Sequence, residues 1–151
     1  MDQHRIRLTT TGAPTETGFE VVAITAGGAN GWEFPADVLQ ESLALWDGAH
    51  SFVDHSWFGH SLRDLGGILY EPTWDAETKG VKAKLKPAGP SAALLAAIGR
   101  EILADDGPKP RVGFSADLTF TATGQKVKQI LKVYSVDLVY EPARGGAFVR
   151  A

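Results

Sequence analysis

The sequence predicts an α+β protein whose strands form a mainly antiparallel sheet or barrel, with a few flanking helices. Three observations indicate this class. Strand-like apolar segments dominate the 151 residues, and only two segments have the apolar spacing of an amphipathic helix. Strands and helices also do not alternate as they do in a doubly wound parallel fold. The length suits a single domain, residues 1–151, with its own core.

Strands are expected wherever apolar residues alternate or run together between turn residues. Such segments are residues 5–10, 18–25, 50–58, 66–71, 80–86, 111–120 and 127–140. Glycines at 27–31 indicate a turn, and the charged stretch 75–78 indicates a hairpin between two of the strands. A Thr-Gly pair separates the last two strands.

Two helices are expected between the strands. Pro35 suits a first helical turn because its φ is already fixed, and apolar residues then recur at helical spacing as far as Trp46. The second helix covers residues 91–104 and is stopped by residues 105–108. Its apolar face is expected to hold Leu94, Leu95, Ile98, Ile102 and Leu103.

The composition excludes several kinds of chemistry. The chain has no cysteine, which rules out disulfides, zinc held by thiolates and a cysteine nucleophile. A net charge of −3 gives no electrostatic reason to expect nucleic acid or an anionic membrane as a partner. The absence of cysteine fits a cytosolic or intracapsid protein. The polar N-terminus is unlike a signal peptide and no apolar stretch is long enough to span a bilayer, so we expect a soluble protein.

Residues 111–120 are apolar at every even position, so the odd positions face away from the core. Ser115 is therefore expected on the polar face of this strand. A serine in such a position is ordinarily a solvated residue on the outer surface. The alternative is a nucleophile displayed on that face.

The strand at residues 127–140 raises a similar question. Ile130, Tyr134, Val136, Leu138 and Tyr140 are expected to share one face. Ser135 and Asp137 lie on the other face among Leu131, Val133 and Val139. A carboxylate among valines and leucines needs a polar partner. A lysine or arginine would serve, and so would a histidine.

His55 lies in the most aromatic stretch of the chain, residues 52–60. A histidine in such surroundings is most often structural. Together with Ser115 and Asp137, however, it completes the set of groups that activates a serine: a base takes the hydroxyl proton and a carboxylate orients the base. Spacing alone does not bring the three together.

A metal-dependent hydrolase is a second interpretation of the same region. Its ligands would come from five acidic and histidine side chains: His50, Asp54, His55, His60 and Asp64. The histidines are five residues apart, which places them on opposite faces of a strand and spreads them around a helix. Only a loop could gather them around a metal ion.

Several segments, taken in order, resemble the prohead (capsid maturation) proteases of tailed phages, which are related in fold to the herpesvirus assemblins. They are the Gly-Trp-Glu-Phe-Pro stretch at 31–35, residues 51–55, the glycine-containing strand 65–69, the Val-Gly-Phe-Ser-Ala-Asp stretch at 112–117, and residues 135–143 with their closing Pro-Ala. The resemblance covers residues 31–147. It implies an assemblin-like fold and a serine endopeptidase.

Carried onto this sequence, the resemblance makes Ser115 the nucleophile, His55 its general base and Asp137 the third catalytic residue. Ser135 is a rival for the third position, but only Asp137 can carry charge. Assemblins have an oxyanion-binding arginine shortly after the third residue, which implies Arg144 or the Gly145 amide here. The glycines at 145–146 could equally form a simple turn. No metal or organic cofactor is implied.

The family's substrates are scaffold or delta segments of the capsid protein and the protease itself. They are cut inside the assembling prohead, in the host cytoplasm. Assemblins are activated by dimerisation, so the resemblance allows a homodimer or higher oligomer here. A non-catalytic capsid-assembly module that keeps the same fold is the remaining alternative.

Overall fold

Strands dominate the computed structural model, which describes residues 3–8, 18–29, 31–54, 59–104, 107–140 and 148–150. The strands are β1 (Gln3–Leu8), β2 (Phe19–Thr25), β3 (Gly27–Ala29), β4 (Trp32–Phe34), β5 (His50–Phe52), β6 (Leu65–Asp75), β7 (Gly80–Pro87), β8 (Val112–Thr123), β9 (Lys126–Tyr140) and β10 (Phe148–Arg150). The helices are α1 (Ala36–Glu41) and α2 (Ala92–Leu103), with short 3₁₀ turns η1 (Leu43–Trp46) and η2 (Leu62–Asp64).

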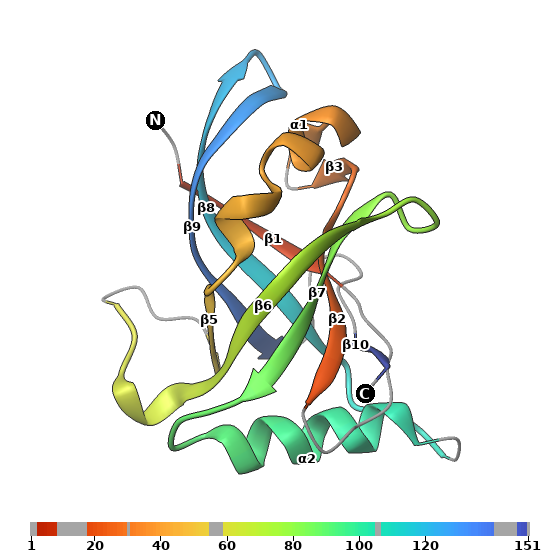
Figure 1. The fold of residues 1–151 in the computed structure, drawn as a ribbon, viewed down its shortest axis with the longest axis vertical. Coiled ribbons are helices and arrows are strands. Elements are labelled where there is room, and N and C mark those ends of the chain that lie inside the picture. The colour runs from red at the N-terminus through yellow and green to blue at the C-terminus, as the bar shows by residue number, and fades with distance from the viewer. Residues whose placement is uncertain are drawn as a thin grey trace.

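The described strands form a single sheet in the order β1-β8-β9-β5-β6-β7-β2-β10, with the β3–β4 hairpin beside β9. Neighbours are antiparallel except where β5 and β4 each meet β9. The sheet curls strongly, with α2 along one end and α1 toward the other (Figure 1). Contacts of β2 with β1 and β8 draw the two edges of the sheet together. The predicted α+β class with a mainly antiparallel sheet is confirmed.

Strand β8 follows the predicted alternation. Phe114, Ala116, Leu118 and Phe120 are at most 2% exposed and belong to the main hydrophobic core. Full burial of a leucine or phenylalanine side chain stabilises the folded state by roughly 1.5–3 kcal/mol. The opposite face of β8 is thereby turned away from the core, as expected.

Strand β9 does not alternate strictly, because it contains three bulges against β8. Asp117 pairs with Ser135, but the next residue of β8, Leu118, pairs with Val133, so that Tyr134 is the extra residue. The prediction that Tyr134 shares a face with Val136 and Leu138 is therefore wrong, whereas Tyr140, opposite Val112, keeps their register. Tyr134 is 45% exposed and Tyr140, at the end of the strand, is 65% exposed.

Helix α2 lies where the sequence predicts it, but its buried face differs. Leu95 and Gly99 are buried, whereas Leu94 is 47% exposed and does not belong to the apolar face that we expected. A Cβ at Gly99 would lie only 2.6 Å from the Phe19 ring, so the missing side chain lets the helix approach the sheet closely. Of the turn predicted at residues 27–31, residues 27–29 instead form strand β3, which pairs with β4.

Two further differences concern short segments. The strand predicted over residues 50–58 comprises His50–Phe52, followed by an isolated bridge at Val53, and residues 55–58 lie outside the described part. The sequence also did not indicate β10, whose Phe148 is buried beside β2. No helix in the described residues is both long and apolar enough to cross a membrane.

Candidate functional site

Ser115 and Asp137 are direct cross-strand neighbours in the β8–β9 ladder. Residues opposite each other in an antiparallel pair project onto the same face, with Cβ atoms about 4.5–5.5 Å apart. Both side chains are completely buried. The expectation of a solvated outer-surface serine at position 115 is therefore wrong, because this face of the sheet is covered. The structure brings together the proposed nucleophile and the proposed acid.

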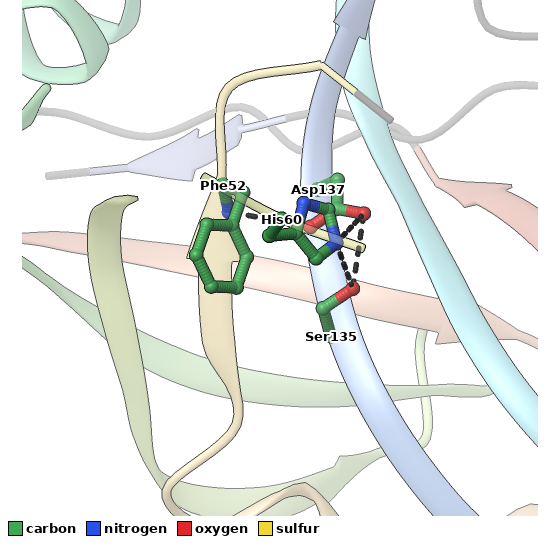
Figure 2. Close-up of polar contacts among 4 residues, drawn as sticks. All are labelled: Phe52, His60, Ser135 and Asp137. Carbon is green, nitrogen blue, oxygen red and sulfur yellow. Dashed lines mark hydrogen bonds and ion pairs between the residues drawn. The ribbon is translucent and has the colours of Figure 1, made fainter. Parts of the chain in front are cut away.

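The carboxylate of Asp137 contacts three groups of the described residues (Figure 2). The backbone N–H of Phe52 donates to Oδ1 at 3.2 Å, and the Ser135 hydroxyl donates to Oδ2 at 2.9 Å. The Nε2 atom of His60 lies 3.3 Å from the same Oδ2. The sequence predicted that this acid would need a polar partner, and the histidine alternative, rather than a lysine or arginine, accounts for one of the contacts described here.

His60 joins this cluster from the segment between β5 and β6. Its ring stacks on the Phe52 ring, with centroids 3.9 Å apart and planes inclined by 4°. Its Nε2 lies 3.3 Å from Ser135 Oγ, and its Nδ1 is buried without a hydrogen-bond partner in the described residues. Sequence reasoning considered His60 only as a metal ligand. Because His60 lies in an irregular segment, no periodic pattern could have assigned it to this face.

The hydroxyl of Ser115 has no hydrogen-bond partner within the described residues. Leaving such a buried group unsatisfied costs about 1–3 kcal/mol. The same holds for Ser51, which lies in β5 next to Phe52. His50 pairs with Ser135 in the β5–β9 ladder, so the next residue, Ser51, faces away from the side that carries Ser135 and Asp137. Ser115 is thus the unpartnered hydroxyl that shares a face with Asp137.

His55, Arg144 and Gly145 lie outside the described residues. The chain is described up to Asp54, the residue before His55. The Asp54 N–H donates to the Leu138 carbonyl at 2.8 Å, and Asp54 has a left-handed backbone with φ of 68°. The last described residue before His55 is therefore fixed to β9, one position beyond Asp137.

The described residues among the expected metal ligands do not lie together around a possible metal site. Among the described residues, no three histidine, aspartate or glutamate side chains form a group that could hold a metal ion. His60 contacts a single carboxylate, that of Asp137, and the exposed His50 ring lies 6.3 Å from the Phe52 ring. His55, the central ligand of that alternative, lies outside the described part.

The fold and the site define a curled, mainly antiparallel sheet protein in which buried hydroxyl and carboxylate groups of the β8–β9 pair meet an imidazole from the segment between β5 and β6. The structure is similar to that of the bacteriophage T4 capsid assembly protease, gp21, with a TM-score of 0.66 and 16% sequence identity. The similarity covers 93% of this chain and 98% of the T4 protein. At this identity it establishes a shared fold, which the sequence resemblance predicted.

Comparison of the sequence with protein-family models found no match. Comparison with curated protein sequences also found none. The similarity to the T4 protein is therefore one of structure.

Proposed function

We propose that this chain is a serine endopeptidase of phage capsid maturation. Ser115 would be the nucleophile, His55 the general base and Asp137 the carboxylate that orients the base. The observation that carries the proposal is the fold shared with a capsid assembly protease over nearly the full length of both chains. The pairing of Ser115 with Asp137 on one face supports the choice of residues.

The reaction would be acyl transfer. The Ser115 Oγ forms a bond to the carbonyl carbon of the substrate while its proton passes to His55, giving a tetrahedral intermediate. The C–N bond then breaks, and His55 protonates the leaving amine. Water attacks the acyl-enzyme by the same route and releases the carboxylate product and Ser115. The chemistry needs no metal or organic cofactor. Arg144 or the Gly145 amide would stabilise the oxyanion.

The position of Asp54 supports His55 as the base. Its backbone is bonded to Leu138, the neighbour of Asp137, and His55 is the next residue of the chain. The carboxylate and the base would therefore come from elements that are already hydrogen-bonded to each other.

The substrates would be scaffold or delta segments of a capsid protein, and the chain itself, cut inside the assembling prohead in the host cytoplasm. A homodimer or higher oligomer would be compatible with this role. A non-catalytic capsid-assembly module is the second candidate. It is favoured by the complete burial of Ser115, since a nucleophile must meet its substrate and the cover over this face would have to open.

A fluorophosphonate probe followed by peptide mass spectrometry tests the proposal. The probe reacts with activated serines, and we expect a single adduct on Ser115. Ser51→Ala is the matched control, because Ser51 is equally buried and its hydroxyl also lacks a partner in the described residues. Ser115→Ala should abolish labelling and cleavage of the capsid precursor, and Ser51→Ala should leave both intact. An adduct on another residue would refute the assignment. Absence of labelling together with absence of cleavage would favour the non-catalytic module.

A further inference from the structure

The contacts of His60 define where its proton lies. A serine hydroxyl has one hydrogen, and an ionised carboxylate can only accept. The Ser135 hydroxyl lies 2.9 Å from Asp137 Oδ2 and therefore donates its hydrogen there. His60 Nε2 lies 3.3 Å from Ser135 Oγ and also 3.3 Å from Asp137 Oδ2, so it faces oxygen lone pairs on both and must carry a proton itself. The two contacts together form a chain of hydrogen bonds from His60 through Ser135 to Asp137.

We propose that His60 is a positioning residue that fixes the Asp137 carboxylate through this chain, a role that rests on the proposed peptidase function. Phe52 contacts both Asp137 and His60. Its N–H holds Oδ1 of Asp137, and its ring supports the His60 ring by stacking. Rotation of the carboxylate would break the bond to Phe52 on one oxygen and that to Ser135 on the other. Asp137 is thus held on both oxygens before any substrate binds.

The geometry argues against Ser135 as a second nucleophile. In a catalytic serine–histidine–aspartate group, the two ring nitrogens have separate partners, one the serine and the other the acid. Here a single nitrogen, Nε2, faces both Ser135 and Asp137, and the serine bonds the acid directly. The hydrogen of Ser135 is therefore committed to Asp137 and is not available for transfer to the histidine. Ser135 and His60 serve the carboxylate.

Three substitutions of His60 distinguish the role of its N–H donor from that of its stacked ring. His60→Gln keeps an N–H near the place of Nε2, His60→Asn places its amide near Nδ1, and His60→Phe keeps only the ring that stacks on Phe52. The readout is the rate of fluorophosphonate labelling at Ser115, with kcat and KM on a peptide substrate. Since a small misplacement of a catalytic group costs up to about a hundredfold, we expect the Phe and Asn variants to be about ten to a hundred times slower in kcat at unchanged KM.

The Gln variant should recover to within about threefold of the wild type, because it restores the donor. His50→Gln is the matched control, since His50 is exposed, stacks only at 6.3 Å on the Phe52 ring, and makes no hydrogen bond or ion pair with Ser135 or Asp137 among the described residues. Equal rates for the wild type and His60→Phe would overturn the proposal. So would equal losses for the Gln and Phe variants, which would mean that the ring has a purely structural role.

A second measurement is independent of catalysis. Nitrogen-15 NMR of the imidazoles, assigned by the loss of the His60 signals in His60→Phe, should show protonated Nε2 and unprotonated Nδ1 for the neutral ring. In Ser135→Ala this preference should weaken. A ring protonated only on Nδ1 would overturn the proposal whether or not the chain is a peptidase. If no variant is labelled, the proposed function fails and the NMR result alone decides on the hydrogen-bond chain.

Discussion

Two buried serines on the same face of the sheet have opposite surroundings. The Ser115 hydroxyl meets no hydrogen-bond partner in the described residues, whereas the Ser135 hydroxyl donates to Asp137. A buried hydroxyl without a partner lowers stability, and a buried carboxylate that loses a donor is penalised further. The fold therefore depends on Ser135, and Ser115 is present at a cost to stability. Such a cost is typical of residues retained for function.

This contrast predicts opposite effects of two alanine substitutions on stability. Ser115→Ala removes a hydroxyl that has no hydrogen-bond partner among the described residues and should raise the free energy of unfolding by about 1 kcal/mol or leave it unchanged. Ser135→Ala leaves Asp137 Oδ2 without that donor and should lower it by about 1–3 kcal/mol. Urea unfolding of both variants against the wild type measures the difference. A Ser115→Ala variant less stable than Ser135→Ala would contradict this account.

Asp137→Asn should preserve the shape of the site but not its hydrogen bonds. An amide has one oxygen for the two donors from Phe52 and Ser135, and it cannot stabilise a charged imidazolium. We expect cleavage of the capsid precursor to slow by roughly a thousandfold to ten-thousandfold. Asp37→Asn is the control, because Asp37 is exposed on α1. Comparable activity of Asp137→Asn and the control would remove Asp137 from the mechanism.

The sequence predicted features of individual site residues but not all of the contacts between them. The polar-face position of Ser115 follows from strand alternation, and the need of Asp137 for a partner follows from its apolar neighbours. That His60 is one of its partners does not follow from either. His60 reaches the carboxylate through an irregular segment held by stacking on Phe52, and such a contact has no sequence period.

At the level of elements, alternation predicted β8 well and β9 only in part. Core residues of β8 are two apart throughout, whereas the bulges of β9 space Val127, Ile130, Val133 and Val136 three apart. A bulge is set by pairing with the neighbouring strand, so the two-residue period of a regular strand does not predict where it falls. The bulge at Tyr134 lies beside Ser135, so the register of the site depends on it.

Gly99 shows a second limit of prediction from sequence, because helix propensity favours alanine at this position and packing against the sheet favours glycine. Alanine in place of a mid-helix glycine gains about 1 kcal/mol, but a Cβ at this position would lie 2.6 Å from the Phe19 ring and 3.0 Å from the Phe148 ring. Overpacking against buried rings costs about 1–3 kcal/mol. Gly99→Ala should therefore lower the free energy of unfolding by up to about 2 kcal/mol.

The control for Gly99 is the reverse exchange on the exposed side of α2. Ala97→Gly should lower the free energy of unfolding by about 1 kcal/mol through propensity alone. Thermal unfolding of both variants distinguishes the two mechanisms. A Gly99→Ala variant more stable than the wild type would show that α2 can move away from Phe19 at little cost.

The β6–β7 hairpin is expected to contribute a pH-dependent part of the stability. The Thr78 hydroxyl donates to Asp75 at 2.7 Å, and this hydrogen bond is the main cause of the lowered pKa of Asp75. Stability from a lowered carboxyl pKa is complete above the ordinary value of 3.8 and is lost as pH falls through the folded-state value. Thr78→Val should therefore destabilise the protein at pH 7.

The same hairpin variant should lose its disadvantage in acid. Once Asp75 is protonated in both states, the hydroxyl no longer stabilises a charge, so the difference between wild type and Thr78→Val should shrink below the ordinary carboxyl pKa. Urea unfolding at pH 7 and near pH 3 tests this. Thr123→Val, an exposed threonine at the end of β8, should show no such pH dependence. An undiminished difference in acid would assign the effect to side-chain packing.

Across the whole molecule, the two ends of the sheet meet where β10 packs behind β8, the strand of the proposed nucleophile. Phe148 of β10 lies edge-on to Phe19 of β2 and to Phe114 of β8, with centroids 5.2 and 4.8 Å apart. Phe114 precedes Ser115. The last strand therefore supports the β8 backbone that carries the proposed nucleophile, although no sequence pattern indicated a strand of three residues.

Phe148→Ala should consequently damage the fold far more than its place near the chain end would indicate. Loss of a fully buried phenylalanine costs about 3–5 kcal/mol. For a chain of this size that lowers Tm by roughly 6–20 °C. Val149→Ala is the control, since Val149 is only partly buried in the same strand, and its Tm should change much less. If the proposed self-cleavage occurred before Phe148, it would release this ring and weaken the support of Ser115. Similar Tm values for the two variants would mean that β10 can be removed without consequence for the site.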